Sequence, residues 1–318
     1  MNGDQEQTTD QSHITFIHDT FQNIRGTLSQ DYFDREIESV LDRFAFNIVI
    51  MGSPRVGKSE LINALCGGSP VAQTSSSLDS CTQEFKKYVL TYPQPQLKGF
   101  PSIEINIFDT PGVESWDDKK GEQEFLKFID KSVPICVIYC ASPGCFSPLG
   151  PLRFLLEHCR EKHIICALIC TNMWSNNNRN TVIEEFKKEL EIFGIKTEKN
   201  FEQDHPGRPH KVTFFGNNAL CAMVNSIEYV DQEMDVSKPV QGVDELIASI
   251  MGLLDSTKMI AWCITVLNRR SFWEKISHQT NGFLELRFME LQNMKEKSAS
   301  EIAHYILHTA IKTYLNLR

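Results

Sequence analysis

The stretch Phe46–Leu65, FNIVIMGSPRVGKSELINAL, decides the fold of this chain. Its first six residues are an apolar run typical of a buried strand, and its last six have the pattern of a helix start. Between them lies G-x-x-x-x-G-K-S, which in a strand–loop–helix setting predicts a phosphate-binding loop. We expect phosphate contacts from the whole loop and from the helix start, that is from Gly52, Ser53, Pro54, Arg55, Val56, Gly57, Lys58, Ser59 and Glu60.

The residue types of this loop suit an anion. Gly52 and Gly57 can adopt backbone angles that other residues avoid, so successive backbone N–H groups can turn inward around a phosphate. The helix that begins near Lys58 adds the positive end of its dipole. The Lys58 ammonium can reach the β- and γ-phosphates, which makes it a candidate catalytic residue, and the Ser59 hydroxyl can bind Mg²⁺.

A second motif, Asp109-Thr110-Pro111-Gly112, supports the first. It follows the strand-like residues 103–108, and Asp109 lies 51 residues after Lys58. An acidic residue at the end of a neighbouring strand can bind Mg²⁺ directly or through water, so Asp109 is a candidate metal ligand. The Gly112 N–H can meet a γ-phosphate and would release it after hydrolysis. The alternative is an ordinary Pro-Gly turn after a strand.

Apolar runs alternate with helical patterns through the middle of the chain. This alternation predicts an α/β fold with a doubly wound, mostly parallel sheet, and a ligand at the carboxyl ends of its strands. Residues 198–210 have the composition of a polar surface excursion. Strands are expected at 84–92, 103–108, 135–140, 164–170, 211–215 and 219–224, and helices at 117–132, 152–162, 181–193 and 244–254.

Composition divides the chain into four parts. Residues 1–13 are polar and predict a disordered tail, and 14–45 carry a helical pattern that predicts a lead-in. The domain built on the phosphate loop occupies 46–255, and a helical extension occupies 256–318. From residue 267 onward this extension carries eight Lys/Arg against five Asp/Glu. Two alternatives stay open for it: a helical cap packed on the core, or an arm that contacts a partner or a membrane surface.

Charge and cysteine usage limit the class of protein. The 318 residues carry a formal net charge of −9, which argues against nucleic acid as a partner because such proteins need a basic surface. No apolar run reaches the roughly 18–20 residues of a membrane span, and the polar N-terminus does not have the pattern of a signal peptide. The ten cysteines include no C-x-x-C pair. We expect them to be small core residues of a cytoplasmic protein.

The order and spacing of the two motifs resemble those of a TRAFAC-class P-loop GTPase domain. The phosphate loop followed by Leu61–Leu65 is similar to that of Era-like GTPases, and the loop Ser77–Gln83 is similar to GIMAP-like and septin-like domains. The resemblance covers about residues 46–254 and implies GTP or GDP with Mg²⁺ as cofactors. It also implies that Thr82, with Ser80 as the alternative, is the switch hydroxyl that joins Mg²⁺ and completes the catalytic residues.

The sequence departs from that pattern in two places. Where the family reads guanine with N/T-K-x-D, this chain has Thr171-Asn172-Met173-Trp174. We keep Thr171, Asn172 and Trp174 as candidate base contacts and expect a weak guanine preference, because an indole cannot replace the bidentate carboxylate. The indole is expected either to stack on the base or to pack in the core. For the last base-contacting motif, both Asn217-Asn218 and Asn225-Ser226 are candidates.

The second departure bears on catalysis. Val113 follows Gly112, where efficient GTPases carry a Gln that orients water. We therefore expect a GTP-binding molecular switch with slow hydrolysis that depends on a partner or on dimerisation. The alternative is a purine-nucleotide-binding scaffold that does not hydrolyse its ligand. The resemblance further implies a homodimer across the nucleotide face and a protein effector that the sequence does not identify.

Overall fold

The structure is a computed structural model that describes residues 45–67, 71–72, 86–92, 103–110, 119–144, 149–201, 210–233, 235–254 and 262. Its strands are β1 (Ala45–Gly52), β2 (Lys86–Tyr92), β3 (Ile103–Asp109), β4 (Cys136–Ala141), β5 (Ile165–Cys170), β6 (Lys196–Phe201), β7 (His210–Phe215), β8 (Ala219–Met223), β9 (Tyr229–Asp231) and β10 (Val236–Lys238). Its helices are α3 (Lys58–Cys66), α4 (Lys119–Ser132), α5 (Arg153–Glu161), α6 (Arg179–Leu190) and α7 (Val243–Met251), with the 3₁₀ turns η2 (Gly150–Leu152) and η3 (Glu191–Phe193).

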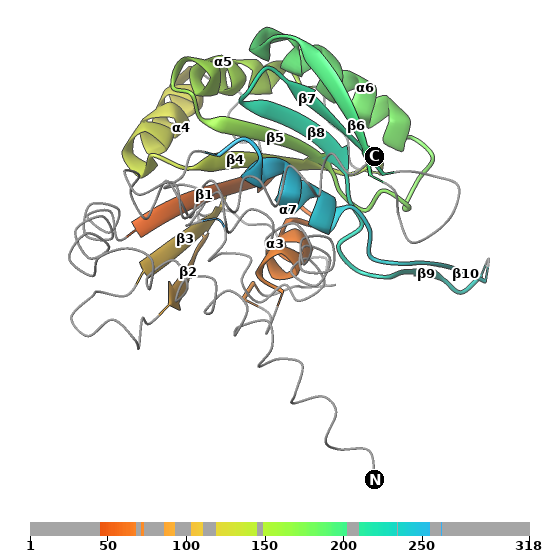
Figure 1. The fold of residues 1–318 in the computed structure, drawn as a ribbon. Helices are drawn as coiled ribbons and strands as arrows, with labels where there is room; N and C mark the ends of the chain where they lie inside the picture. The colour runs from red at the N-terminus through yellow and green to blue at the C-terminus, as the bar shows by residue number, and fades with distance from the viewer. Residues whose placement is uncertain are drawn as a thin grey trace, which may run out of the picture.

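The strands β1 to β8 form one sheet in the order β2-β3-β1-β4-β5-β8-β7-β6 (Figure 1). The five central strands from β3 to β8 are parallel to their neighbours. The outer strands β2, β7 and β6 pair antiparallel. This arrangement confirms the predicted α/β fold with a mostly parallel sheet. The parallel strands place the ends of β1, β3, β4, β5 and β8 along one edge of the sheet.

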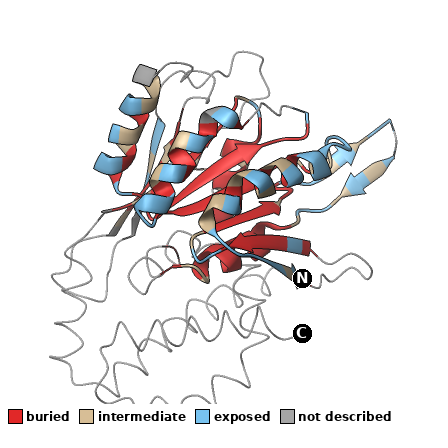
Figure 2. Ribbon diagram, turned by 90° about the horizontal axis from the view of Figure 1, so that it is seen from above, coloured by how far each residue is buried: buried red, intermediate tan, exposed pale blue. Residues whose placement is uncertain are grey.

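Helices cover both faces of the sheet. The side chains of β1 show why: Ile48 and Ile50 belong to the apolar cluster shared with α3 and α7. Val49 and Met51 belong to the cluster shared with α4, α5 and α6. Successive strand residues point to opposite faces, so a continuous apolar run serves both clusters. Figure 2 shows buried central strands and, on the face covered by α4, α5 and α6, helices whose outer surfaces are exposed.

Helix α7 is buried along its whole length. Trp262, which lies beyond the end of α7, is itself fully buried and donates its indole N–H to the Ile247 carbonyl at 3.3 Å. Trp262, which follows α7 in the chain, therefore shields part of this helix from solvent. Apart from Trp262, the expected extension 256–318 lies outside the described residues, as do the expected tail 1–13 and, apart from Ala45, the expected lead-in 14–45.

The described cysteines are core residues, as the sequence indicates. Cys136 and Cys140 share one face of β4, and Cys166 and Cys170 share one face of β5. Burial raises the pKa of the Cys140 and Cys170 thiols to about 12, so these thiols are poor nucleophiles. The free, buried cysteines of the described residues are Cys66, Cys136, Cys140, Cys159, Cys166, Cys170 and Cys221.

Two elements differ from the sequence-based expectation. The predicted polar excursion at 198–210 is wrong in its first part, because residues 196–201 form the edge strand β6, paired with β7. Its charged side chains resemble a loop in composition, yet such residues suit an edge strand because they oppose pairing with another sheet. The short hairpin β9–β10 was not expected; it projects from the body after β8 (Figure 1).

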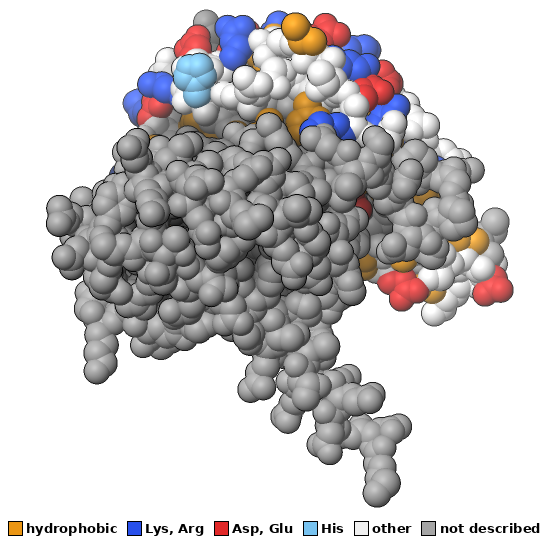
Figure 3. Space-filling model, viewed as in Figure 1, with side chains coloured by type: hydrophobic (Ala, Val, Ile, Leu, Met, Phe, Trp, Pro, Cys, Tyr) orange, Lys and Arg blue, Asp and Glu red, His pale blue; other side chains and the backbone are white. Residues whose placement is uncertain are grey.

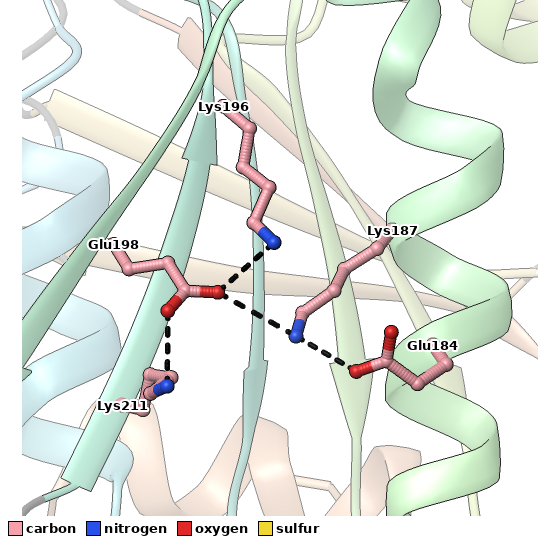
Figure 4. A network of polar contacts seen from close by, with 5 residues as sticks. All are labelled: Glu184, Lys187, Lys196, Glu198 and Lys211. Carbon is pink, nitrogen blue, oxygen red and sulfur yellow. Dashed lines mark hydrogen bonds and ion pairs between the residues drawn. The ribbon is translucent and has the colours of Figure 1, made fainter.

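A cluster of charged side chains links β6 to β7 and to α6 (Figure 4). Glu198 accepts a hydrogen bond from Lys211 at 2.9 Å and lies 3.1 Å from the Lys196 ammonium. Lys187 of α6 lies 3.6 Å from Glu198 and 2.8 Å from Glu184. The hydrogen bonds from Lys211 and Lys196 lower the pKa of Glu198 to about 2. The cluster links α6 to the sheet edge through a shared carboxylate.

None of the helices in the described ranges has both the length and the apolar character that crossing a bilayer requires.

Candidate functional site

The loop between β1 and α3 closes tightly over the sheet. Gly52 has φ 140°, and a Cβ there would lie 2.0 Å from the Cys140 carbonyl oxygen of β4. Gly57 has φ 89° and is the N-cap of α3. A Cβ at Gly57 would lie 3.1–3.4 Å from the side chain of Asn172. Gly52 is therefore required by backbone angle and by space, and Gly57 by its backbone angle, which is the local geometry that a backbone anion cradle needs.

Helix α3 begins directly after this loop. The Leu61 N–H donates to the Gly57 carbonyl at 3.0 Å, which is the first hydrogen bond of the helix. The N–H groups of a first helical turn have no partner within the helix, so they are available to an anion. Ser59 and Glu60 lie in this turn and are partly exposed, whereas Arg55 is exposed and has φ 65°.

Lys58, the first residue of α3, points back into the loop. Its side chain is buried, and its ammonium donates to the carbonyls of Gly52 and Ser53, each at 3.0 Å. The same nitrogen lies 4.0 Å from Oδ1 of Asp109. One ammonium therefore joins the loop to the end of β3, and the two sequence motifs meet at it.

Asp109 ends β3 beside the phosphate loop. It pairs in register with Ile50 of β1 and with Lys86 of β2, and the following Thr110 N–H donates to the Ile50 carbonyl at 3.1 Å. The carboxylate is buried, and its Oδ1 has no hydrogen-bond partner among the described residues. Burial raises the pKa of Asp109, against the opposing effects of the Lys58 and Lys86 charges. An ionised oxygen in this position is one that a bound cation would satisfy.

The residues after β5 lie against the loop. The Thr171 hydroxyl contacts the carbonyl oxygens of Val56 in the loop and of Ala141 at the end of β4, the latter at 3.0 Å. Asn172 has φ 48°, and its side chain is the group that faces Gly57. The tertiary structure thus brings Thr171 and Asn172 to the phosphate loop, where the Thr171 hydroxyl is engaged by the backbone.

Trp174 lies further along the same edge. The guanidinium carbon of Arg179 is 4.6 Å from the centre of the indole ring, and the Lys238 ammonium is 5.6 Å from it. The ring is partly buried, and its Nε1 is buried with no hydrogen-bond acceptor among the described residues. The indole is thus neither a full core residue nor an exposed platform, because cations from α6 and from β10 lie over it.

The end of β8 resolves one alternative that the sequence left open. Asn225-Ser226 follows β8 at the same sheet edge as Trp174, whereas Asn217-Asn218 joins β7 to β8 at the opposite edge. The Asn225 amide donates to the carbonyls of Ile227 at 2.6 Å and Pro239 at 3.0 Å. Ser226 is buried, and its hydroxyl has no hydrogen-bond partner among the described residues.

Some predicted site residues fall outside the described ranges. These are Thr82, its alternative Ser80, Gly112 and Val113. Three other residues enter the site from the structure alone: Lys86, Arg179 and Lys238. No local pattern marks them in the sequence, since each reaches the site through strand pairing or through a contact with a distant element.

Comparison with known proteins shows that part of the chain is similar to a GTPase family. Residues 47–171 match the family model described as 50S ribosome-binding GTPase. The tRNA modification GTPase MnmE of Herminiimonas arsenicoxydans is 35% identical over 107 residues, which are 32% of this chain and 20% of that protein. Neuronal-specific septin-3 of Mus musculus is 26% identical over 188 residues, which are 51% of this chain and 53% of that protein. The chain thus spans from a fifth to about half of the length of these relatives.

Solved structures with a similar outline include the G domain of the T. maritima FeoB iron transporter. It is 21% identical in sequence and has a TM-score of 0.34, and the match covers 66% of this chain and 98% of that domain.

Proposed function

We propose that this chain, whose residues 47–171 match a GTPase family model, is a P-loop GTPase of the TRAFAC class that acts as a GTP-binding molecular switch with slow GTP hydrolysis. The observation that carries the proposal is the meeting of Lys58 and Asp109 at 4.0 Å beneath a glycine-closed loop. A buried ammonium, a buried carboxylate whose Oδ1 has no hydrogen-bond partner among the described residues, and a helix N-terminus are groups that bind a nucleoside triphosphate together with its cation.

The phosphate part of the ligand would lie on the loop. Its backbone N–H groups, with those of the first turn of α3, would hold the phosphate oxygens. The Lys58 ammonium would exchange its carbonyl acceptors at Gly52 and Ser53 for the stronger, charge-assisted hydrogen bonds of a phosphate. Gly112, by resemblance, would add an N–H from the second motif.

Ser59 and Asp109 would hold Mg²⁺, with Thr82 added by resemblance. The residues present fit this ion, because hydroxyl and carboxylate oxygens are the ligands that Mg²⁺ prefers and because Oδ1 of Asp109 is buried with no hydrogen-bond partner among the described residues. When bound, Mg²⁺ neutralises charge on the phosphate oxygens. The charges of Lys58 and Lys86 favour the ionised form of Asp109, against the larger effect of burial, which raises its pKa.

Slow hydrolysis follows from Val113, whose side chain cannot orient water. A partner or a second copy across the nucleotide face would then supply the missing group. The β9–β10 region offers a surface for such a partner: Ile227, Val230 and Val240 are 54%, 58% and 44% exposed. Figure 3 shows hydrophobic side chains together with acidic ones on this projection. The second candidate function, a scaffold that binds nucleotide without hydrolysis, is favoured by the same Val113.

Calorimetric titration with GTP, GDP and ATP in Mg²⁺, followed by a single-turnover phosphate assay, tests the proposal. We expect micromolar or tighter GTP binding that is lost in Lys58→Ala, and phosphate release that is slow without a partner. Thermal melting of the variant shows whether it is folded. No binding of any nucleotide by the folded wild-type chain would refute the proposal, and binding without phosphate release would favour the scaffold.

A further inference from the structure

The edge formed by the ends of β5 and β8 carries hydrogen-bond donors where a guanine-reading carboxylate would be expected. Trp174 occupies that position, and its indole N–H is buried without an acceptor among the described residues. Ser226, which follows the neighbouring strand β8, has a buried hydroxyl that also lacks a hydrogen-bond partner among the described residues. Two adjacent strand ends thus each present a polar group that has no hydrogen-bond partner among the described residues. The indole N–H can only donate and the hydroxyl can donate, so a ligand with acceptor atoms would satisfy both.

Two cationic side chains lie over the Trp174 ring. Arg179 at the start of α6 lies 4.6 Å from the Trp174 ring centre, and its Nη1 donates to the Met173 carbonyl at 3.3 Å. Lys238 of β10 lies 5.6 Å from the same ring centre. The Asn225 amide nitrogen donates to two backbone carbonyls, so its N–H groups are already used in the loop that leads to β9. The two side chains that lie over the Trp174 ring are therefore hydrogen-bond donors with positive charge.

A purine base presents different groups at positions 6 and 2. Guanine, hypoxanthine and xanthine all have a carbonyl oxygen at position 6, which accepts, whereas adenine has an amino group there, which donates. At position 2, guanine has a donating amino group, hypoxanthine has hydrogen, and xanthine has a second carbonyl oxygen. A carboxylate accepts a hydrogen bond from the guanine 2-amino group, but hydrogen-bond donors and cations do not.

We infer that the nucleotide site recognises 6-oxopurine triphosphates as a class, without reading the 2-amino group of guanine. Trp174, Ser226 and Lys238 are the residues that set this specificity. The inference rests on the proposed function, because it assumes that the phosphate loop holds a nucleoside triphosphate. ITP and XTP then bind about as tightly as GTP. ATP binds more weakly, because its 6-amino group faces other hydrogen-bond donors.

Calorimetric titration of the full chain with GTP, ITP, XTP and ATP in Mg²⁺ tests this reading. We expect the dissociation constants for ITP and GTP to agree within about threefold, since no charged acceptor reads the amino group. XTP should bind at least as tightly as GTP, because xanthine adds an acceptor and is the most acidic of the three bases. ATP should bind at least about tenfold more weakly than GTP.

Three variants separate the parts of the inference. Trp174→Asp restores the carboxylate and should create a preference for GTP over ITP of about tenfold or more, with XTP weakened by repulsion of its second carbonyl. Trp174→Phe keeps a ring for Arg179 but removes the N–H, so all three 6-oxopurine nucleotides should weaken in parallel. Lys238→Gln should weaken XTP more than GTP.

The matched control is Lys188→Gln, which removes the same charge from an exposed lysine further along α6. It should leave all four affinities unchanged. Binding of ITP at least tenfold weaker than GTP by the wild-type chain would overturn the inference while leaving the proposed function intact. Equal binding of ATP would also overturn it. If no nucleotide binds, both the inference and the proposed function fail.

Discussion

The Lys58 ammonium lies 4.0 Å from Oδ1 of Asp109, and the two side chains are only 6% and 3% exposed. This contact joins the first residue of α3 to the last residue of β3, and thus the phosphate loop to the Asp-Thr-Pro-Gly motif. The pair is only partly compensated, because Lys58 donates to two loop carbonyls whereas Oδ1 of Asp109 has no hydrogen-bond partner among the described residues. A buried charge that is incompletely paired costs stability, and functional sites are where such costs are retained.

The first prediction concerns Asp109→Asn. Burial raises the pKa of Asp109, so its charged form destabilises the folded chain, and this loss grows as the pH rises from the unfolded pKa through the folded one. The amide resembles the protonated acid. We therefore expect Asp109→Asn to have an equal or higher free energy of unfolding without ligand at pH 7, while Mg²⁺-dependent GTP binding falls at least tenfold. Urea unfolding and calorimetry measure the two effects. A marked loss of stability would show that the Lys58 contact outweighs burial.

The second prediction concerns the closed turn at Gly52. Gly52→Ala would place a Cβ 2.0 Å from the Cys140 carbonyl oxygen at a φ of 140°, so either the loop or β4 must move. We expect a loss of at least about 3 kcal/mol in unfolding free energy, and loss of nucleotide binding. Gly150→Ala is the control, since nothing lies within 4 Å of a Cβ there. Equal denaturation midpoints for the two variants would contradict the geometry.

A third prediction isolates the Thr171 hydroxyl, which contacts the Val56 and Ala141 carbonyls. Thr171→Val keeps the shape but removes the donor from beneath the phosphate loop. We expect a loss of about 1–2 kcal/mol in unfolding free energy and weaker GTP binding, because a buried carbonyl is left without a donor. Thr171→Ser, which retains the hydroxyl, should recover most of both. Failure of the serine variant to recover would assign the effect to the methyl group instead.

The fourth prediction is a pH dependence at the edge strand β6. The pKa of Glu198 is lowered to about 2, so its ion pairs stabilise the fold above the unfolded pKa of roughly 4.3 and are lost as the pH falls toward 2. Because this side chain is partly exposed, we expect Glu198→Gln to lower the unfolding free energy at pH 7 by only about 0.5–1 kcal/mol. The difference from wild type should shrink with acidification.

Urea unfolding between pH 3 and pH 7 measures this difference. Glu161→Gln, at an exposed position at the end of α5, is the control and should show little change at any pH. A difference between Glu198→Gln and wild type that stays constant with pH would exclude the ion pairs as its cause.

The phosphate loop and the central strands could be predicted from the sequence because their signals are local. The strand, the two glycines, Lys58 and the helix start lie within Phe46–Leu65, so backbone angles, helix capping and apolar periodicity define them without distant contacts. Strand β5, which precedes Thr171, is a continuous apolar run, and β3, which precedes Asp109, alternates apolar with polar residues. That the loop and the Asp109 motif belong together followed from their order along the chain.

Only the tertiary structure decided what surrounds those motifs. Asn225-Ser226 and Asn217-Asn218 are equivalent as sequence, but the parallel pairing of β8 with β5 brings the former to the site edge and leaves the latter at the opposite edge. Lys86 faces Asp109 through the antiparallel register of β2 with β3, and Lys238 reaches Trp174 from the β9–β10 hairpin. Strand order and register are set by packing across the whole domain, so residues distant in the chain become neighbours without leaving a local pattern.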